Sequence, residues 1–161
     1  MKPEIVKKDA FKVVGMKTKF TMNNNTIAQL WGQFFPRMAE IQNVVNPGVA
    51  YGVCEADSDV DIEKTTDDTE FTEIACLEVS SFDQIPEGMV TKVIPANTYA
   101  RFTHRGSLEG LHKTYNYIYH TWLPQSGYQR AGIYDFELYD QRFNMREPDK
   151  SEVDIYLPVK K

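Results

Sequence analysis

Residues 133–140 have the sequence IYDFELYD, in which a glutamate, Glu137, lies among tyrosines. Glu137 is the first candidate for a functional residue. Polar and apolar residues alternate there, as in a β-strand, so Asp135 and Tyr139 share the face of Glu137. We expect the helices to cover the opposite, apolar face. Glu137 then points into water, opposite a lysine, or into a cleft. A carboxylate in a cleft costs several kcal/mol unless it is protonated or meets a cation.

Aromatic residues are the excess in the composition, with nine Phe, nine Tyr and two Trp, or 12% of the chain. An aromatic face attracts a cation by roughly 0.5–2 kcal/mol and provides contact area without demanding one ligand shape. Each of these rings also suits a hydrophobic core. Those that we expect to line a site around Glu137 are Trp31, Phe34, Tyr51, Tyr99, Tyr115, Tyr119, Trp122 and Tyr139.

Two other groups of side chains resemble metal sites and are set aside. Residues 57–68 resemble a calcium loop, but Ile62 stands where the glycine belongs and Asp68 where the glutamate belongs, so we expect a solvated acidic loop. Three histidines recur every eight residues without a cysteine or carboxylate to complete a ligand set: His104, His112 and His120. No phosphate-binding, dinucleotide-binding or nucleophile motif occurs. We expect neither a metal nor a cofactor.

The charge and length exclude several classes of protein. The net charge is −5, with acidic residues gathered between positions 57 and 70 and no basic stripe, which argues against direct nucleic-acid binding. Cys54 and Cys76 lie in alternating runs and form no CxxC pair, so we expect them to be buried and reduced. Neither a signal peptide nor an apolar run of about 18 residues is present. The 161 residues predict one cytoplasmic domain with no membrane contact.

The hydrophobic pattern predicts eight strands and two helices. The strands are expected at 3–8, 10–20, 49–55, 70–80, 89–94, 98–104, 132–140 and 152–159. An apolar stripe from Ile27 to Ile41 predicts the first helix, which Pro36 should kink or end early. A second stripe from Leu111 to Trp122 predicts another, stopped by Pro124 and Gly127.

The element order is ββαββ twice, which argues for an internal duplication with halves at about 1–82 and 83–161. FTEIACLEV at 71–79 aligns with SEVDIYLPV at 151–159, matching Leu77 to Leu157. Glu55, at the end of YGVCE, aligns with Glu137, and by this alignment Tyr51 faces the same way as Glu137. Two such halves would enclose a central cleft, and helices on one face of antiparallel strands make the fold α+β.

The end of the chain resembles the GyrI-like small-molecule-binding domain, which also forms the effector-binding half of some AraC-type and MerR-type regulators and shares the SOUL fold. FELY at 136–139 and DIYLP at 154–158 resemble that family's FE-x-Y and DIY-x-P strands. Leu30-Trp31, Tyr99-Ala100 and Gly106-Ser107 add to the likeness, which covers nearly the whole chain. The resemblance implies that Glu137 is the family's buried, cation-binding glutamate. We expect no helix-turn-helix before residue 1, so the DNA-binding role of the regulators is not carried over. No histidine is clearly placed on the pocket face for the haem of SOUL proteins.

Three functions remain open. The favoured one is a binding protein that senses or sequesters lipophilic, aromatic or cationic molecules around Glu137. The second is a small hydrolase of electrophilic natural products in which the same glutamate is the general base. The third, implied by the family alone, is an interaction protein that acts as a homodimer or through a partner such as a transcription regulator or gyrase. We expect a binder rather than an enzyme.

Overall fold

Strands make up most of the chain. The computed structural model describes residues 1–56, 64–144 and 146–161. All the strands except β7 fall within two residues of the predicted ranges. Within the described residues they are β1 (Glu4–Lys8), β2 (Phe11–Phe20), β3 (Ala50–Ala56), β4 (Phe71–Val79), β5 (Val90–Ile94), β6 (Asn97–Arg105), β7 (Gln129–Arg130), β8 (Tyr134–Tyr139) and β9 (Glu152–Lys160).

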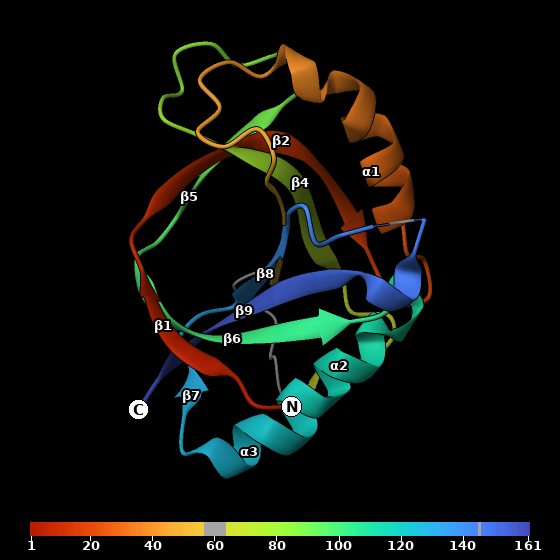
Figure 1. Ribbon diagram of the computed structural model, residues 1–161, viewed down its shortest axis with the longest axis vertical. Helices are drawn as coiled ribbons and strands as arrows, with labels where there is room; N and C mark the ends of the chain where they lie inside the picture. Colours follow the sequence, from red (N-terminus) through yellow and green to blue (C-terminus); the bar gives the residue numbers. More distant parts are fainter. Residues whose placement is uncertain (57–63, 145) are drawn as a thin grey trace.

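These strands form one antiparallel sheet in the order β1-β6-β9-β8-β3-β4-β2-β5, with β7 beside β9. The central pair is β3 with β8. At one corner, Lys8 at the end of β1 pairs with Asn97 of β6, while Phe11 at the start of β2 pairs with Ile94 of β5. Because only a few residues separate Lys8 from Phe11, the two ends of the strand order meet at this corner. The sheet therefore curls into a half-barrel with an inner and an outer face (Figure 1).

The first helical region confirms the effect predicted for Pro36. Helix α1 (Ile27–Phe34) passes into a 3-10 helix, η1 (Phe35–Glu40), in which Pro36 takes an early position. Proline has no backbone N–H to continue the α-helical hydrogen bonds, so the α-helix ends at this point. Leu30 and Phe34 are the buried residues of α1.

The second helical region contains the predicted stripe from Leu111 to Trp122 and ends before Gly127, as predicted. It runs through η3 (Leu108–Gly110), α2 (Leu111–Tyr117), a π-helical turn η4 (Ile118–Trp122) and α3 (Leu123–Ser126). Pro124 does not stop it, because it lies in the first turn of α3, directly after the wide π turn, where no N–H is needed. The stop is Gly127, whose φ of 79° is in the left-handed region that favours glycine.

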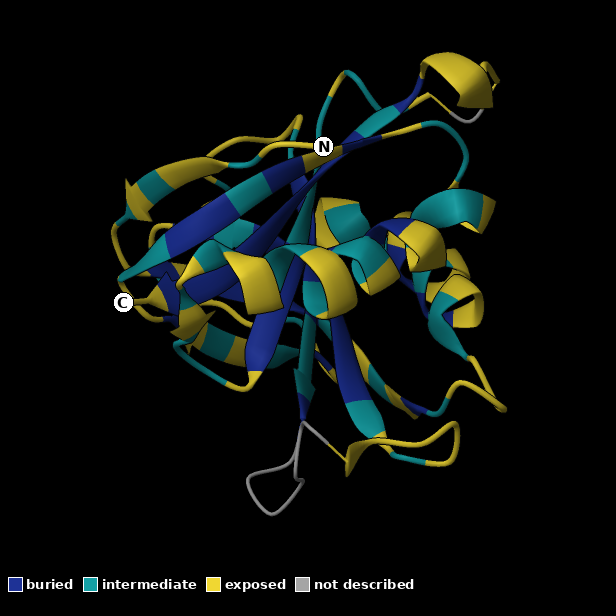
Figure 2. Cartoon of the chain, turned by 90° about the horizontal axis from the view of Figure 1, so that it is seen from below, coloured by how far each residue is buried: buried dark blue, intermediate teal, exposed yellow. Residues whose placement is uncertain are grey.

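Both helical regions lie on the outer face of the sheet (Figure 1), and a separate hydrophobic core fills the inner face. Under α1 lies a cluster that includes Leu30 and Leu77, and under α2 lies one that includes Ile118 and Leu157. The inner cluster is rich in aromatic residues. Figure 2 shows buried strand segments beneath helices whose outward turns are exposed.

The ββαββ order occurs twice, as predicted, and places the two helices over opposite halves of the sheet. Leu77 and Leu157, which the sequence aligns, hold matching places under α1 and α2. The alignment of Glu55 with Glu137 is wrong, because alternation along β3 puts Glu55 on the face of the inner-cluster residue Val53. There the Glu55 carboxylate pairs with Lys92 of β5 at 2.6 Å.

Some predictions concern segments or features away from the central strands. The part of the acidic run that spans 57–63, with its resemblance to a calcium loop, lies outside the described residues. In the described part of the chain, no group of three or more His, Cys, Asp or Glu residues is arranged to hold a metal ion. None of the helices described is long and apolar enough to cross a membrane. Both cysteines are free thiols, and Cys76 is buried.

Candidate functional site

The outer face of β8 carries the carboxylates. Tyr134 and Phe136 belong to the inner cluster. Alternation therefore turns Asp135, Glu137 and Tyr139 to the outer face, toward the helices. The sequence predicted which residues share a face, but the prediction that the helices cover the apolar face is wrong. The curled sheet buries the apolar face of β8 against itself, and the polar face of β8 lies on the outer side, beside the apolar clusters under the helices.

Glu137 is fixed by two tyrosine hydroxyls. Tyr115 of α2 donates to Glu137 Oε2 at 2.6 Å, and Tyr139 donates a short hydrogen bond to Oε1. Burial raises the pKa of Glu137, and the two hydrogen bonds act in the opposite direction because they stabilise the charged form. No ion pair to Glu137 occurs within the described residues. The carboxylate is thus positioned and hydrogen-bonded, but it has no positive partner.

A second glutamate, Glu73 of β4, leans toward the same place. Glu73 is only 3% exposed, and its carboxyl group makes neither a hydrogen bond nor an ion pair within the described part of the chain. A methyl group built on Gly52 would lie 2.8 Å from Glu73 Oε2, 3.6 Å from Glu137 Oε1 and 3.5 Å from the Trp31 ring. Because Gly52 has no side chain, a space is left over its Cα atom, and both carboxyl groups turn toward that space.

The electrostatics of Glu73 follow from this placement. Burial, reinforced by the neighbouring charges of Glu137 and Asp135, raises the pKa of Glu73 well above its usual value. Desolvation disfavours a charge, and no nearby donor compensates for it. Glu73 is therefore the member of this group that most readily keeps a proton.

Asp135 differs from Glu73 because neighbouring groups partly offset the cost of its burial. Tyr119 donates a short hydrogen bond to Asp135 Oδ2, and the Arg130 guanidinium lies 4.8 Å from the centre of the Tyr119 ring. Burial raises the pKa of Asp135, while the hydroxyl of Tyr119 and the charge of Arg130 lower it. Asp135 thus has a donor and a nearby cation.

Four rings surround the carboxylates between the two helices. Trp31 of α1 meets Tyr139 edge to face, with ring centres 5.4 Å apart. Tyr115 and Tyr119 on α2 and the π turn are stacked, with centres 6.3 Å apart. All four are half-buried. The rings enclose Glu137 and each keeps some access to solvent, so the site is closed by side chains that can rotate.

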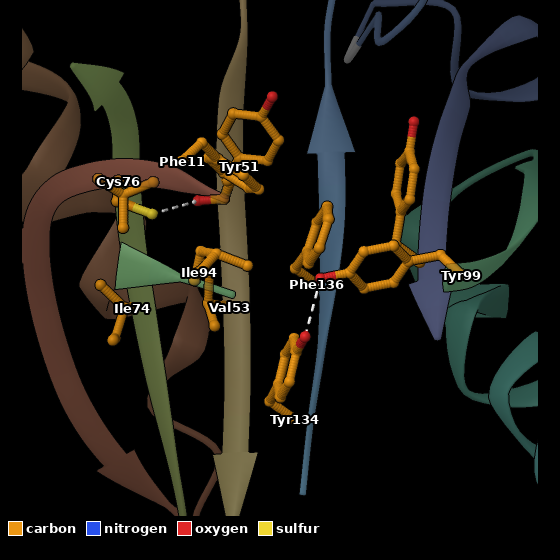
Figure 3. Close-up of a cluster of buried hydrophobic side chains, with 11 residues drawn as sticks. Phe11, Tyr51, Val53, Ile74, Cys76, Ile94, Tyr99, Tyr134 and Phe136 are labelled. Carbon is orange, nitrogen blue, oxygen red and sulfur yellow. Dashed lines mark hydrogen bonds between the residues drawn. The ribbon is translucent and has the colours of Figure 1, made fainter. Parts of the chain in front are cut away.

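Two of the predicted wall residues lie on the other side of the sheet. Tyr51 packs against Phe11 at 5.1 Å in the inner cluster. Tyr99 is also there, with its hydroxyl 2.8 Å from that of Tyr134 (Figure 3). The prediction that Tyr51 faces the same way as Glu137 is therefore wrong, because it depended on the incorrect alignment of the halves.

Phe34 and Trp122 lie on the helical face but do not reach the carboxylates. Phe34 is fully buried beneath α1 and supports Trp31, with ring centres 5.9 Å apart. Trp122 packs edge to face on Phe102 at 5.1 Å, within the core under α2. The structure therefore brings together Glu137, Trp31, Tyr115, Tyr119 and Tyr139 from the predicted set.

Sequence reasoning did not identify Glu73 or Gly52 as parts of this site. A signal was available for Glu73, because alternation along β4 puts it on the same face as Ala75, Leu77 and Val79, which are apolar and buried. A charged residue in an apolar row is unusual and marks a candidate site. Gly52 gave no comparable signal, since only the register of β3 between β4 and β8 shows what its missing side chain admits.

A curled antiparallel sheet with two helices over its outer face, and with carboxylates beneath aromatic rings between them, defines the class of this protein as a small-molecule-binding domain. The chain belongs to the GyrI-like small molecule binding domain family, which matches residues 1–160. The family and fold predicted from the sequence are thereby confirmed.

The relatives include a transcription regulator. The chain is 38% identical over 160 residues to the transcriptional regulator BrlR of Pseudomonas aeruginosa, an alignment that covers 99% of this chain and 56% of the regulator. The chain thus spans about half the length of that relative.

Solved structures share the fold at low sequence identity. SAV2435 bound to tetraphenylphosphonium matches with a TM-score of 0.76 at 16% identity, over 99% of this chain and 94% of that one. The C-terminal domain of EcmrR matches with a TM-score of 0.73 at 15% identity, over 99% and 98% of the two chains. A hydrolase encoded by lin2189 of Listeria innocua matches with a TM-score of 0.57 at 13% identity, over 99% and 92%.

Proposed function

We propose that this domain binds lipophilic aromatic cations, with Glu137 as the counter-charge. The observation that carries the proposal is that Glu137 lies under four aromatic rings and is bonded only to neutral hydroxyls. Glu137 is half-buried. A carboxylate that is partly removed from water and has no positive partner is costly, and an incoming cation relieves that cost. The likeness to SAV2435, whose structure holds tetraphenylphosphonium, supports the same class of ligand.

The surrounding rings suit such a ligand. Trp31, Tyr115, Tyr119 and Tyr139 offer aromatic faces, each of which adds roughly 0.5–2 kcal/mol of attraction to a cation. The hydroxyls of Tyr115 and Tyr139 stabilise the carboxylate. An incoming cation replaces part of that stabilisation when the rings turn aside, so different ligands can be accommodated by different ring positions.

The decisive experiment compares a cation with a neutral molecule of similar shape. Tetraphenylphosphonium and triphenylphosphine oxide are titrated into wild-type protein and into Glu137→Gln, with calorimetry as the readout. Removing the charge is expected to lower the affinity for the cation by about 10–100-fold and to change the affinity for the neutral ligand little. This range corresponds to the roughly 1.5–3 kcal/mol that is typical of a hydrogen bond to a charged group.

Glu55→Gln is the matched control, because Glu55 is a glutamate of the adjacent strand β3 on the opposite face of the sheet and pairs there with Lys92. It should leave both affinities unchanged. Equal weakening of both ligands by Glu137→Gln, or an effect of Glu55→Gln as large as that of Glu137→Gln, would contradict the proposal.

A hydrolase is the second candidate, because Glu137 combines a raised pKa with adjacent hydroxyls. In that mechanism Glu137 takes a proton from water while the water oxygen bonds to a ring carbon of an epoxide. The bond between that carbon and the ring oxygen breaks, and the resulting alkoxide takes up the proton that Glu137 received. Incubation with an epoxide, followed by mass spectrometry, tests this function. Release of a product heavier by one water, lost in Glu137→Gln, favours the enzyme, and an unchanged ligand favours the binder.

Action through a protein partner, such as a transcription regulator or gyrase, and assembly into a homodimer stay predictions. The relative BrlR is a transcriptional regulator that matches this chain over 56% of its own length. A pull-down from cell extract with and without tetraphenylphosphonium tests the partner, and failure to recover a regulator or a topoisomerase contradicts it.

A further inference from the structure

Glu73 is the one carboxyl group at the site that has no partner among the described residues. It is 3% exposed, and its Oε2 atom reaches the space over Gly52 that Glu137 also approaches. Glu137 has two tyrosine donors, and Asp135 has Tyr119 and the nearby Arg130. No fully enclosed side-chain nitrogen or oxygen of the described residues lacks a hydrogen-bond partner, so the unpaired Glu73 oxygens keep a small contact with solvent. A carboxyl group that is so little exposed and has no partner is still rare in folded proteins and calls for an explanation.

The groups that face Glu73 offer it no positive charge. Cys54 lies opposite it on β3, and β8 contributes Glu137, Asp135 and Tyr139. The ring that α1 adds over Gly52 is that of Trp31, which is neutral. Nothing in this set stabilises a charged Glu73, so without a cation the surroundings favour its protonated form.

We propose that Glu73 is a second anionic contact, which makes the site prefer cations with several N–H donors, such as an aromatic amidinium, over quaternary cations of the same size. The inference rests on the proposed function, in which Glu137 attracts the cation. It adds that one ligand group bridges Glu137 and Glu73 over Gly52.

The chemistry of the two carboxyl groups favours this class of ligand. To be ionised in a buried place, a carboxylate needs hydrogen bonds as well as an opposite charge. A planar amidinium presents N–H groups on two sides and can donate to two carboxylates at once, as guanidinium groups do. A quaternary ammonium or phosphonium has no N–H to donate. It can therefore pair with Glu137 through its charge but leaves Glu73 protonated.

The experiment uses 2-naphthamidinium and 2-naphthyltrimethylammonium, titrated calorimetrically into wild-type protein, Glu73→Gln and Glu137→Gln. Glu73→Gln is expected to lower the affinity for the amidinium by about tenfold or more and to leave the affinity for the quaternary cation nearly unchanged. The reason is that only the amidinium loses hydrogen bonds to a charged group. Glu137→Gln should weaken both cations.

The outcomes separate the two proposals. If Glu73→Gln leaves the ratio of the two affinities as it is in the wild type, the role of Glu73 is overturned while that of Glu137 stands. If Glu137→Gln leaves both affinities unchanged, or neither cation binds the wild-type protein, the proposed function fails and the inference falls with it.

A measurement on the wild-type protein alone provides a second test, which holds even if Glu73→Gln does not fold. Titrations in two buffers of different ionisation enthalpy count the protons released on binding. The amidinium should release more protons than the quaternary cation, by up to one, because it alone ionises Glu73. Equal proton counts for the two ligands overturn the inference.

Discussion

Replacing Glu73 by glutamine is expected to stabilise the fold, and to do so more at high pH than at low pH. In the unfolded chain Glu73 titrates near its ordinary pKa of 4.5, whereas burial and the charges of Glu137 and Asp135 raise its pKa in the folded protein. Between these two pKa values the folded protein binds more protons than the unfolded chain, so its stability falls as the pH rises. Glutamine has nearly the same shape and no proton to lose.

The size of the effect follows from the number of protons. One proton held by the folded protein and not by the unfolded chain changes the free energy of unfolding by about 1.4 kcal/mol per pH unit. Each pH unit between the ordinary pKa and the raised pKa of the folded protein should therefore add about 1.4 kcal/mol to the advantage of Glu73→Gln, or about 3–6 °C in melting temperature for a chain of this length. Below about pH 4 the difference should vanish, because both forms are then neutral at this position.

Urea unfolding of both proteins at a series of pH values from about 4 to about 8 measures this difference. Glu70→Gln is the control, because Glu70 directly precedes the same strand but its side chain is 54% exposed. Its stability curve should run parallel to that of the wild type. If the stability curve of Glu73→Gln also runs parallel to that of the wild type, Glu73 is not desolvated in solution. The reasoning about the pair of Glu73 and Glu137 is then refuted.

Three further outcomes are expected. Gly52→Ala places a methyl group 2.8 Å from Glu73 Oε2, so the carboxyl group must move, and calorimetry should show a fall in amidinium affinity of about tenfold. Phe136→Ala empties a fully buried position on the inner face and should cost about 3–5 kcal/mol in urea unfolding. Binding of tetraphenylphosphonium should weaken as the pH falls through the raised pKa of Glu137, because only the ionised carboxylate attracts the cation, and Glu137→Gln should abolish this pH dependence.

Local sequence patterns were sufficient to predict the main strands and the two helical regions. Alternation of polar and apolar residues fixes the strands because successive side chains point to opposite faces, and the two apolar stripes fix the helices. Pro36 ends α1 for a reason contained in one residue. Pro124 is the counterexample, since its effect depends on the π turn before it, which the sequence pattern does not reveal. The motif at 136–139 also singles out Glu137.

Tertiary structure decided which residues meet. Alternation shows that Phe136 and Glu137 lie on opposite faces, but only the curling of the sheet shows that the aromatic face is buried against itself and the polar face lies under the helices. For the same reason Tyr51 belongs to the core and Trp31 to the site. Glu73 and Glu137 are far apart in the chain and approach each other because β3 lies between their strands with Gly52 at the point where they converge. Such a contact is set by strand order and register, and neither is encoded in any short segment of the sequence.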